Sequence, residues 1–341
     1  MYKYFKYIDH VYIIAEIGNN HNGNKETAKE LIDIAANAGV DAVKFQTFRG
    51  VDIVSPIIKA DEYKEWDVKG FDYWYQFIDS IALSLEDHHE IFDYARNRGI
   101  EPISTPTSPE IVEFLENLDA SFYKIASMDI TNVQLIKKVA KTGKPVVLST
   151  GMAEYDDILT ATNLLKNNEL VLLHCISDYP TDPKDANIKS IEYLKETFKT
   201  TVGLSDHSIT NEFAIGSVML GAEIIEKHIT YDRNAKEKAE HHFSIEPKEL
   251  EDLVKSIRNI EKGIGRKILY RSKKENANKH KFRRSLHVNK NLNKGEILKE
   301  SDIIVVRPDD GDDPMNYEKY IGKELIQNIS KWQPLTKKYI L

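Results

Sequence analysis

The sequence predicts an α/β fold in which a (β/α)8 TIM barrel is followed by a small, mostly β second domain. Eight short runs of apolar, largely β-branched residues alternate with longer segments of helical periodicity up to about residue 262. A strongly basic stretch then leads to short strand-like pieces separated by Asn, Gly and Pro. Because few polar residues interrupt the eight runs, we expect parallel strands that are buried on both faces.

The eight strands are predicted at 11–17, 41–47, 101–104, 122–126, 145–149, 170–175, 201–205 and 223–229. Helices are predicted in the gaps, for example at 25–38, 86–97, 132–141 and 211–220. Several of these helices are followed by the glycine that is typical after a last helical turn, namely Gly39, Gly99, Gly143 and Gly221.

Residues 49–85 interrupt the alternation after the second strand and are rich in aromatic side chains, including Trp66, Tyr73, Trp74, Tyr75 and Phe77. The segment is long for a connection between a strand and a helix. It follows the C-terminal end of a strand, where barrels place their active sites. Two interpretations stay open: a lid or substrate wall, and an extra helix that packs its aromatic residues on the barrel.

The basic stretch at 266–284 marks a boundary between domains, because it carries nine Lys or Arg residues against Glu275. We interpret it as a solvated linker rather than a patch for phosphate or nucleic acid. The predicted domains are therefore a barrel at 1–265, a basic linker at 266–282 and a small β domain at 283–341.

Composition excludes several classes of partner. The chain has 47 Lys plus Arg and 54 Asp plus Glu residues, so its net charge of −7 offers no overall positive field to nucleic acid or to an anionic membrane. A single Cys175 cannot form an intrachain disulfide, and neither a long apolar run nor a leader pattern is found. We expect a cytoplasmic protein with no nucleic-acid or membrane partner.

Polar residues gather where the predicted strands end. Lys44 and Lys124 lie on strands, and the hydroxyls of Thr105, Ser127 and Ser149 come near strand ends. A buried lysine is costly unless it meets an anion, and a phosphate ligand would satisfy both lysines and the hydroxyls together. The pattern predicts a phosphate site, with scattered salt bridges inside the barrel as the alternative.

Two histidines end neighbouring strands, His207 after the seventh and His228 after the eighth. Two imidazoles with open positions for water and substrate suit a divalent metal such as Mn²⁺, Fe²⁺, Co²⁺ or Zn²⁺ that acts as a Lewis acid on a carbonyl. His174 could join them, whereas Cys175 is expected to be a small buried hydrophobe. The alternative is that each histidine is an ordinary core residue.

These motifs resemble the sialic acid synthase family, that is, the bacterial N-acetylneuraminate synthases and their legionaminic and pseudaminic acid relatives. The resemblance rests on residues 14–23, 41–48, 123–127, 148–152, 174–175, 179–181, 203–207 and 226–228. The last segment, with motifs at 283–285, 294–296 and 306–308, resembles the family's antifreeze-like C-terminal domain, also called the SAF domain. The resemblance covers essentially the whole chain.

The resemblance implies a metal-dependent, aldol-type condensation of phosphoenolpyruvate with N-acetylmannosamine or a related 2-acetamido sugar, giving a sialic acid and phosphate. It implies that Mn²⁺, or else Mg²⁺ or Co²⁺, is bound by His207 and His228, and that Glu16, Tyr179 and Glu226 orient water and move protons. The implied phosphoenolpyruvate site consists of Lys44, Gln46, Thr105, Lys124, Ser127, Ser149 and Ser205.

The implied sugar site is where the chain departs from the family pattern. It consists of Asp129, Ser177, Tyr179, Glu240 and Arg307. Asp129 stands where the family usually has Glu, Ser177 where many members have Asn, and Glu240 where Asp is usual. The resemblance also implies a domain-swapped homodimer in which Arg307 reaches the partner's sugar.

The departures leave the acceptor sugar open. The alternatives are a synthase for another nonulosonate such as legionaminic or pseudaminic acid, a phosphoenolpyruvate aldol enzyme of the heptulosonate or octulosonate type, and a non-catalytic sugar-binding barrel.

Overall fold

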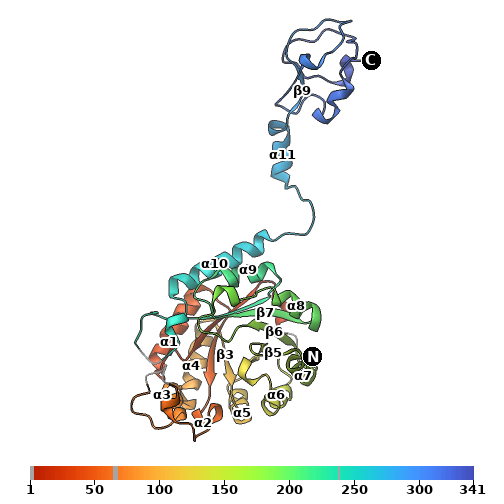
Figure 1. Ribbon diagram of the computed structural model, residues 1–341. Helices are drawn as coiled ribbons and strands as arrows, with labels where there is room; N and C mark the ends of the chain where they lie inside the picture. Colours follow the sequence, from red (N-terminus) through yellow and green to blue (C-terminus); the bar gives the residue numbers. More distant parts are fainter. Residues whose placement is uncertain (1–3, 64–67, 237–238) are drawn as a thin grey trace. The chain divides into compact units, whose positions relative to one another are not determined.

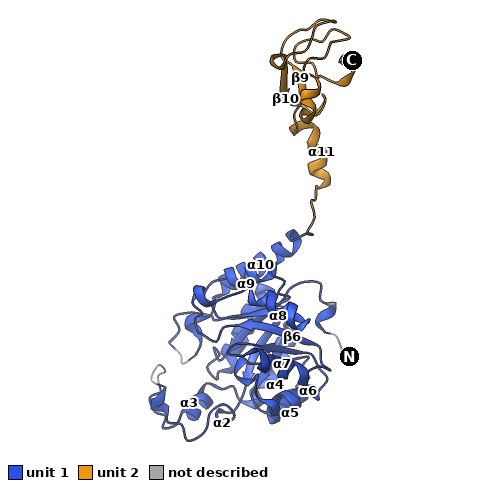
Figure 2. Cartoon of the chain, turned by 45° about the vertical axis from the view of Figure 1, so that its right-hand side comes forward, with its two compact units in different colours: residues 1–265 blue, residues 266–341 orange. Residues whose placement is uncertain are grey.

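The structure, a computed structural model, describes residues 4–63, 68–236 and 239–341 (Figure 1). Within these residues the chain divides into two compact units, 1–265 and 266–341, which Figure 2 colours separately. Each unit has its own hydrophobic core and is described by itself.

The first unit is built on eight parallel strands, as the sequence predicts. They are β1 (Tyr12–Gly18), β2 (Ala42–Thr47), β3 (Glu101–Pro106), β4 (Tyr123–Ile125), β5 (Val146–Ser149), β6 (Leu170–Cys175), β7 (Thr201–Asp206) and β8 (Ile224–His228). Hydrogen bonds run in the order β3-β2-β1-β8-β7-β6-β5-β4, and the two end strands, β3 and β4, lie in contact. The strands thus form a nearly closed barrel, which confirms the predicted TIM-barrel architecture.

Helices surround the barrel (Figure 1). They are α1 (Lys25–Ala38), α2 (Gly50–Ile53), α3 (Trp74–Ile81), α4 (Leu85–Asn97), α5 (Pro109–Asn117), α6 (Val133–Ala140), α7 (Tyr155–Leu164), α8 (Ser190–Phe198), α9 (Glu212–Met219) and α10 (Pro247–Gly263). Helix α1 shows why they begin and end where they do: the Asn24 side chain accepts from the backbone N–H groups of Glu26 and Thr27, and Gly39 ends it with φ of 79°.

The two faces of each strand have different roles. Outward residues such as Ile13, Val43 and Ile225 pack with the helices in the main core. Inward residues such as Ile14 and Phe122 form a second cluster that fills the lower barrel. Because side chains alternate along a strand, the next inward residue lies two positions further on and faces the upper barrel.

The aromatic insertion packs on itself. The Tyr63 and Trp74 rings stack at 4.2 Å between centroids, and Trp74 stacks on Phe77 at 4.7 Å. No described residue of 49–85 lines the main cavity of the barrel. The structure therefore supports the extra packing helix, α3, rather than the lid; Trp66 lies outside the described residues.

The second unit contains a small antiparallel sheet of β9 (Ser285–Val288) and β10 (Ile303–Val306), paired through Val288 and Ile303. Its core includes Leu286, Leu298 and Tyr320. The stretch predicted as a linker contains a helix, α11 (Lys273–Phe282), which begins where the Ser272 hydroxyl accepts from the backbone N–H of Glu275. None of the residues of this helix is buried. Its sequence has no apolar stripe, which is the pattern from which a helix is predicted.

No helix in the described part of the chain is both long enough and apolar enough to cross a membrane.

Candidate active site

A cavity of about 830 Å³ opens in the barrel unit at the C-terminal ends of the strands. It gathers nearly every site residue that the sequence predicts for the barrel. Those lining it are Glu16, Lys44, Gln46, Thr105, Lys124, Ser127, Ser149, Ser177, Tyr179, Ser205, His207, Glu226, His228 and Glu240. Such a cavity, with a few polar groups converging in it, is the usual form of a barrel active site.

Strand alternation explains why these residues meet. On β1 the buried Ile14 precedes Glu16 by two residues, and on β4 Phe122 precedes Lys124 in the same way. The same spacing relates Ala42 to Lys44, Ile103 to Thr105, Val147 to Ser149, and Ile224 to Glu226. Each strand therefore supplies an apolar residue to the lower barrel and a polar residue to the cavity floor.

Lys44 is the centre of an ion-pair network on this floor. Its Nζ lies 2.7 Å from Oε2 of Glu16 and 3.7 Å from Oε2 of Glu226, and it donates to Thr105 Oγ1 at 3.1 Å. Burial would lower the pKa of Lys44, but the two carboxylates outweigh burial and raise it. The salt bridges considered as the alternative to a phosphate site are therefore present at Lys44.

Lys124 is in a different electrostatic state. Its Nζ donates to the Ile125 carbonyl at 3.2 Å, and its ion pair with Glu226 is long, at 3.7 Å. Burial lowers the pKa of Lys124, and the Glu226 carboxylate offsets this lowering only in part. A buried cation with so little compensation gains most from an anionic ligand, so Lys124 is the natural first contact for one.

Several buried polar atoms in the cavity have no hydrogen-bond partner among the described residues. They are Oγ of Ser149 and of Ser177; Oε2 of Glu16, Oε2 of Glu226, Nδ1 of His228 and Oε2 of Glu240 also lack a hydrogen bond, but each of these four takes part in an ion pair. Buried polar groups are nearly always satisfied in folded proteins. Their concentration in one cavity indicates a site built for a polar ligand.

The two predicted metal ligands come together at one side of the cavity. The rings of His207 and His228 are 5.3 Å apart, and Tyr179 lies over His207 at 4.2 Å. Nδ1 of His207 lies 2.7 Å from the Ile176 carbonyl, which leaves Nε2 as the nitrogen able to bind a ligand. Nδ1 of His228 lies 3.3 Å from Oε2 of Glu240 without completing a hydrogen bond.

Two imidazoles fit a divalent metal only if ligand and water complete its coordination. No group of three His, Cys, Asp or Glu side chains suitable for a metal was found among the described residues. His228, whose Nδ1 makes no hydrogen bond, and the orientation of His207 nevertheless provide imidazole nitrogens of the kind that Mn²⁺, Fe²⁺, Co²⁺ and Zn²⁺ accept. His174 does not join them, because its Nε2 is within hydrogen-bond distance, 2.8 Å, of the Ala186 carbonyl.

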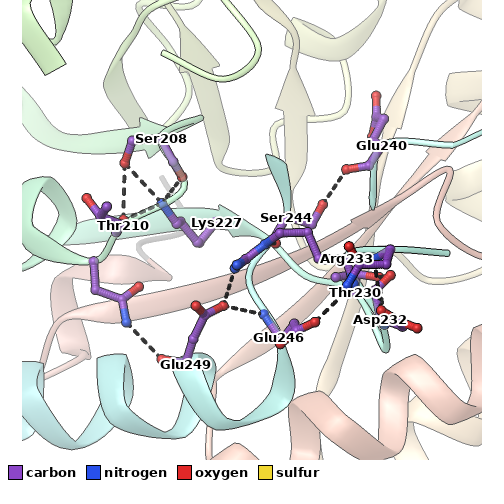
Figure 3. A network of polar contacts seen from close by, with 12 residues as sticks. Ser208, Thr210, Lys227, Thr230, Asp232, Arg233, Glu240, Ser244, Glu246 and Glu249 are labelled. Carbon is purple, nitrogen blue, oxygen red and sulfur yellow. Dashed lines mark hydrogen bonds and ion pairs between the residues drawn. The ribbon is translucent and has the colours of Figure 1, made fainter. Parts of the chain in front are cut away.

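Gly18 allows Glu240 to approach the floor. A Cβ on Gly18 would lie 2.5 Å from Oε2 of Glu240, and this residue has φ of 54°, in the left-handed region that favours glycine. The backbone of Glu240 is fixed from behind by the Ser244 hydroxyl, which donates to the Glu240 carbonyl at 2.7 Å (Figure 3). The Asn20 amide in turn donates to Ser244.

Asp129 differs from its predicted place, since it is not among the residues that line the cavity. Residues Ser127–Asp129 form a 3₁₀ turn, and the Asp129 carboxylate accepts from Asn132 Nδ2 at 3.0 Å. Met128 lines the cavity instead. Arg307 belongs to the second unit, where its guanidinium lies 5.3 Å from the centre of the Phe282 ring.

Further lining residues were not singled out from the sequence. They are Thr107, Ala126, Met128, Met152, Lys236, Ala239, His242 and Phe243. The last four come from the long connection between β8 and α10, which has no regular period to predict where a side chain faces. Cys175 also lines the cavity, and its Sγ lies 3.9 Å from Nδ1 of His207.

Comparisons with known proteins agree with this geometry. Residues 31–269 match the NeuB family, and residues 283–341 match the SAF domain. The N,N'-diacetyllegionaminic acid synthase of Campylobacter jejuni is 39% identical over 94% of this chain and 97% of its own length. A pseudaminic acid synthase of Campylobacter jejuni is 36% identical over 94% and 93%.

Solved structures show the same fold. The N-acetylneuraminic acid synthetase of Leptospira borgpetersenii, determined in complex with citrate, has a TM-score of 0.71 at 32% identity, covering 79% of this chain and 90% of that chain. A truncated 3-deoxy-D-arabino-heptulosonate 7-phosphate synthase of Thermotoga maritima has a TM-score of 0.57 at 15% identity, covering 76% of this chain and 90% of that chain. The second likeness concerns the fold alone.

The two floor lysines should affect stability differently. Lys44→Met removes the cation that pairs with Glu16 and Glu226 and leaves both carboxylates buried. We therefore expect the free energy of unfolding to fall by about 3–5 kcal/mol. Lys124→Met removes a cation that burial already disfavours, and we expect a change below about 1 kcal/mol. Urea denaturation of both variants checks this order; equal losses, or a larger loss for Lys124→Met, would contradict it.

Proposed function

This chain belongs to the NeuB family, and on that premise we propose that it condenses phosphoenolpyruvate with the open-chain aldehyde of an N-acetylated amino sugar. The products are a nine-carbon 2-keto acid, or nonulosonate, and inorganic phosphate. The observation that carries the proposal is the cavity floor, where two buried lysines and several hydroxyls converge, among them the Ser149 hydroxyl, which has no partner among the described residues.

The two lysines are the groups of this floor that would bind phosphoenolpyruvate. Its phosphate and carboxylate supply the anions that Lys124, and then Lys44, would meet. The hydroxyls of Ser149 and Ser127 would donate to the remaining oxygens, because Ser149 Oγ has no hydrogen-bond partner among the described residues and Ser127 Oγ accepts, rather than donates, in its bond with the backbone N–H of Gly151; the Ser205 hydroxyl, also in the cavity, donates to Glu226. Gln46 donates to Oε1 of Glu16 at 2.9 Å and so keeps that carboxylate oriented toward the ligand.

The proposed reaction forms one carbon–carbon bond and breaks one carbon–oxygen bond. C3 of phosphoenolpyruvate attacks the aldehyde carbon, whose oxygen takes up a proton. Water adds at C2 and loses one proton; the C2–O bond to phosphate then breaks while the new C2 hydroxyl gives its remaining proton to the departing phosphate, which leaves the keto group.

Glu226 suits the role of accepting the proton from water. Burial alone would raise the pKa of Glu226, yet Lys124 and Lys44 outweigh it and lower the pKa, so the carboxylate is ionised at neutral pH. Its Oε1 accepts from Ser205 at 2.7 Å, whereas Oε2 has no hydrogen-bond partner in the described structure. Glu16, Glu240 and Tyr179 are the other groups within the cavity that can orient water or hold a proton.

His207 and His228 would hold the divalent metal, Mn²⁺ in our proposal, with Mg²⁺ or Co²⁺ as alternatives. When bound, the ion would supply Lewis acidity toward the aldehyde oxygen. The support for this assignment is the pair of imidazole rings, whose centroids lie 5.3 Å apart, among the residues that line the cavity. The role of the protein is to keep both rings in place and to present the sugar beside them.

The acceptor sugar is proposed to carry more than one apolar substituent. Met128 and Met152 both line the cavity with partly exposed side chains, and the residues beside them are joined where the backbone N–H of Gly151 donates to Ser127 Oγ at 3.0 Å. Methionine side chains pack well against methyl groups. Together with the legionaminic and pseudaminic relatives, this wall favours a 2,4-diacetamido-trideoxy hexose over N-acetylmannosamine, which stays the second candidate.

The proposal includes a homodimer in which Arg307 of one subunit completes the sugar site of the other. Its support is the resemblance of 283–341 to the SAF domain together with the position of Arg307 after β10.

Phosphate release tests the reaction. The protein is supplied with phosphoenolpyruvate, Mn²⁺ and, in turn, N-acetylmannosamine, its 6-phosphate, and 2,4-diacetamido-trideoxy hexoses. We expect release of inorganic phosphate with a diacetamido sugar, abolished by chelation and reduced at least about 100-fold in His228→Ala.

Each arm of that assay has a distinct meaning. Release with the 6-phosphate alone would identify a phosphorylated acceptor and contradict the proposed sugar. Silence across the panel from a folded, metal-loaded protein would contradict the synthase assignment for these sugars and favour a binding role.

The apolar wall gives a second test. Met128→Gln keeps the length of the side chain but removes its apolar end, so we expect kcat/KM for the preferred diacetamido sugar to fall about tenfold. Phosphate release with N-acetylmannosamine should change little. Met219→Gln, on the exposed end of α9, is the matched control and should leave both values unchanged. An equal fall for both sugars would show that Met128 does not select between them.

A further inference from the structure

A buried ion pair lies directly behind the two histidines. Nζ of Lys227, on β8, is 2.8 Å from Oδ2 of Asp206, on β7, and both residues are buried. The two residues face each other in the strand register. Neither lines the cavity, so the catalytic chemistry proposed above does not use them.

Strand alternation ties this pair to the histidines. Ser205 and Glu226 are also register partners, and both face the cavity. The next residues, Asp206 and Lys227, therefore face the opposite side of the strands. The residues after them, His207 and His228, return to the cavity. Each imidazole is thus one peptide unit beyond one member of the ion pair.

Lys227 also holds the chain on the far side of His207. Its ammonium group donates to the carbonyls of Ser208 and Thr210, the latter at 2.8 Å (Figure 3). Oδ1 of Asp206 accepts from the backbone N–H of Ser208 at 2.9 Å. The segment 206–210 is therefore wrapped around one ammonium group, with His207 inside the wrapped segment.

The remaining contacts of His207 leave it little freedom. Its Nδ1 lies 2.7 Å from the Ile176 carbonyl, and its own carbonyl accepts from the backbone N–H of Thr181 at 3.1 Å. The ring and the carbonyl of His207 are thus held by the loop after β6, whereas Lys227 holds the residues that follow His207, at the carbonyls of Ser208 and Thr210. Residues that hold a metal ligand without touching the metal commonly influence the affinity of the site for that metal.

We propose that Lys227 and Asp206 are positioning residues that fix the separation and orientation of His207 and His228 for divalent-metal binding. The inference rests on the proposed metal-dependent function. An ammonium group suits the task because its three donors can reach a carboxylate and two carbonyls at once. A neutral side chain in its place leaves Asp206 buried without its cation and frees the segment that carries His207.

Mn²⁺ affinity is the readout, because it requires no turnover. Metal-stripped protein is titrated with Mn²⁺, and the free ion is followed by its electron paramagnetic resonance signal. We expect Lys227→Met to raise the Kd for Mn²⁺ about 10–100-fold while the protein keeps its fold by circular dichroism.

Arg258→Met is the matched control. Arg258 forms an ion pair with Asp41 at 3.0 Å, near the N-terminal end of β2 and away from the cavity, so its loss removes another ion pair of the barrel, one that is less buried than Lys227–Asp206. We expect the Kd for Mn²⁺ in this variant to stay within about twofold of the unchanged protein. An equal rise in both variants would attribute the effect to general loosening and overturn the proposal.

A second variant covers a failure to fold. Asp206→Asn preserves the size of the side chain and leaves the carbonyl contacts of Lys227 in place, so we expect a smaller rise of about five- to tenfold. If Lys227→Met folds and binds Mn²⁺ like the unchanged protein, the positioning role is wrong. If Lys227→Met fails to fold, the same conclusion follows when Asp206→Asn folds and binds Mn²⁺ like the unchanged protein.

The two proposals fail in different ways. If the unchanged protein binds no Mn²⁺, or binds it as tightly after His228→Ala, the metal site itself is wrong. If His228→Ala abolishes binding and Lys227→Met does not weaken it, only the positioning role is wrong.

Discussion

The floor of the barrel depends on one electrostatic constraint, the burial of Lys44 between two carboxylates. Its ammonium group pairs with Glu16 on the adjacent strand β1 and with Glu226 on the next strand, β8, so β1, β2 and β8 are joined through a single charge. Once this network is formed, Glu226 is ionised and Lys124 is left with little compensation. The same interaction that holds the strands together thereby prepares a cation for an anionic ligand.

Alternation along the strands separates support from chemistry. Residues that face the cavity carry the charged and hydroxyl groups, whereas those on the opposite side carry the core and the Lys227–Asp206 pair. Because the two sets belong to the same strands, a change on the outer side is transmitted through one peptide unit to His207 or His228. The loops above the cavity are thus separate from the strands that form its floor, which is the division that lets barrels differ in substrate on a common framework.

The sequence predicts most of the barrel because strand positions and inward residues follow a period of two, which places Lys44 and Lys124 without any tertiary information. The sequence wrongly places Asp129 in the sugar site. A three-residue 3₁₀ turn and a hydrogen bond from Asn132 hold its carboxylate away from the cavity, and Met128 lines the cavity instead. The connection after β8 that supplies Lys236 has no periodic pattern at all. Helix α11 is not predicted either, because a helix with no buried residues has no apolar stripe in its sequence.

The central claim is that this floor activates phosphoenolpyruvate for attack through carbon and release of phosphate by C–O cleavage. Phosphoenolpyruvate labelled with ¹⁸O at the oxygen that bridges C2 and phosphorus tests it directly, with both products analysed by mass spectrometry. We expect the label in the released phosphate and a nonulosonate whose keto oxygen comes from water. Label retained in the keto acid would mean that the P–O bond breaks, and would contradict the proposed chemistry.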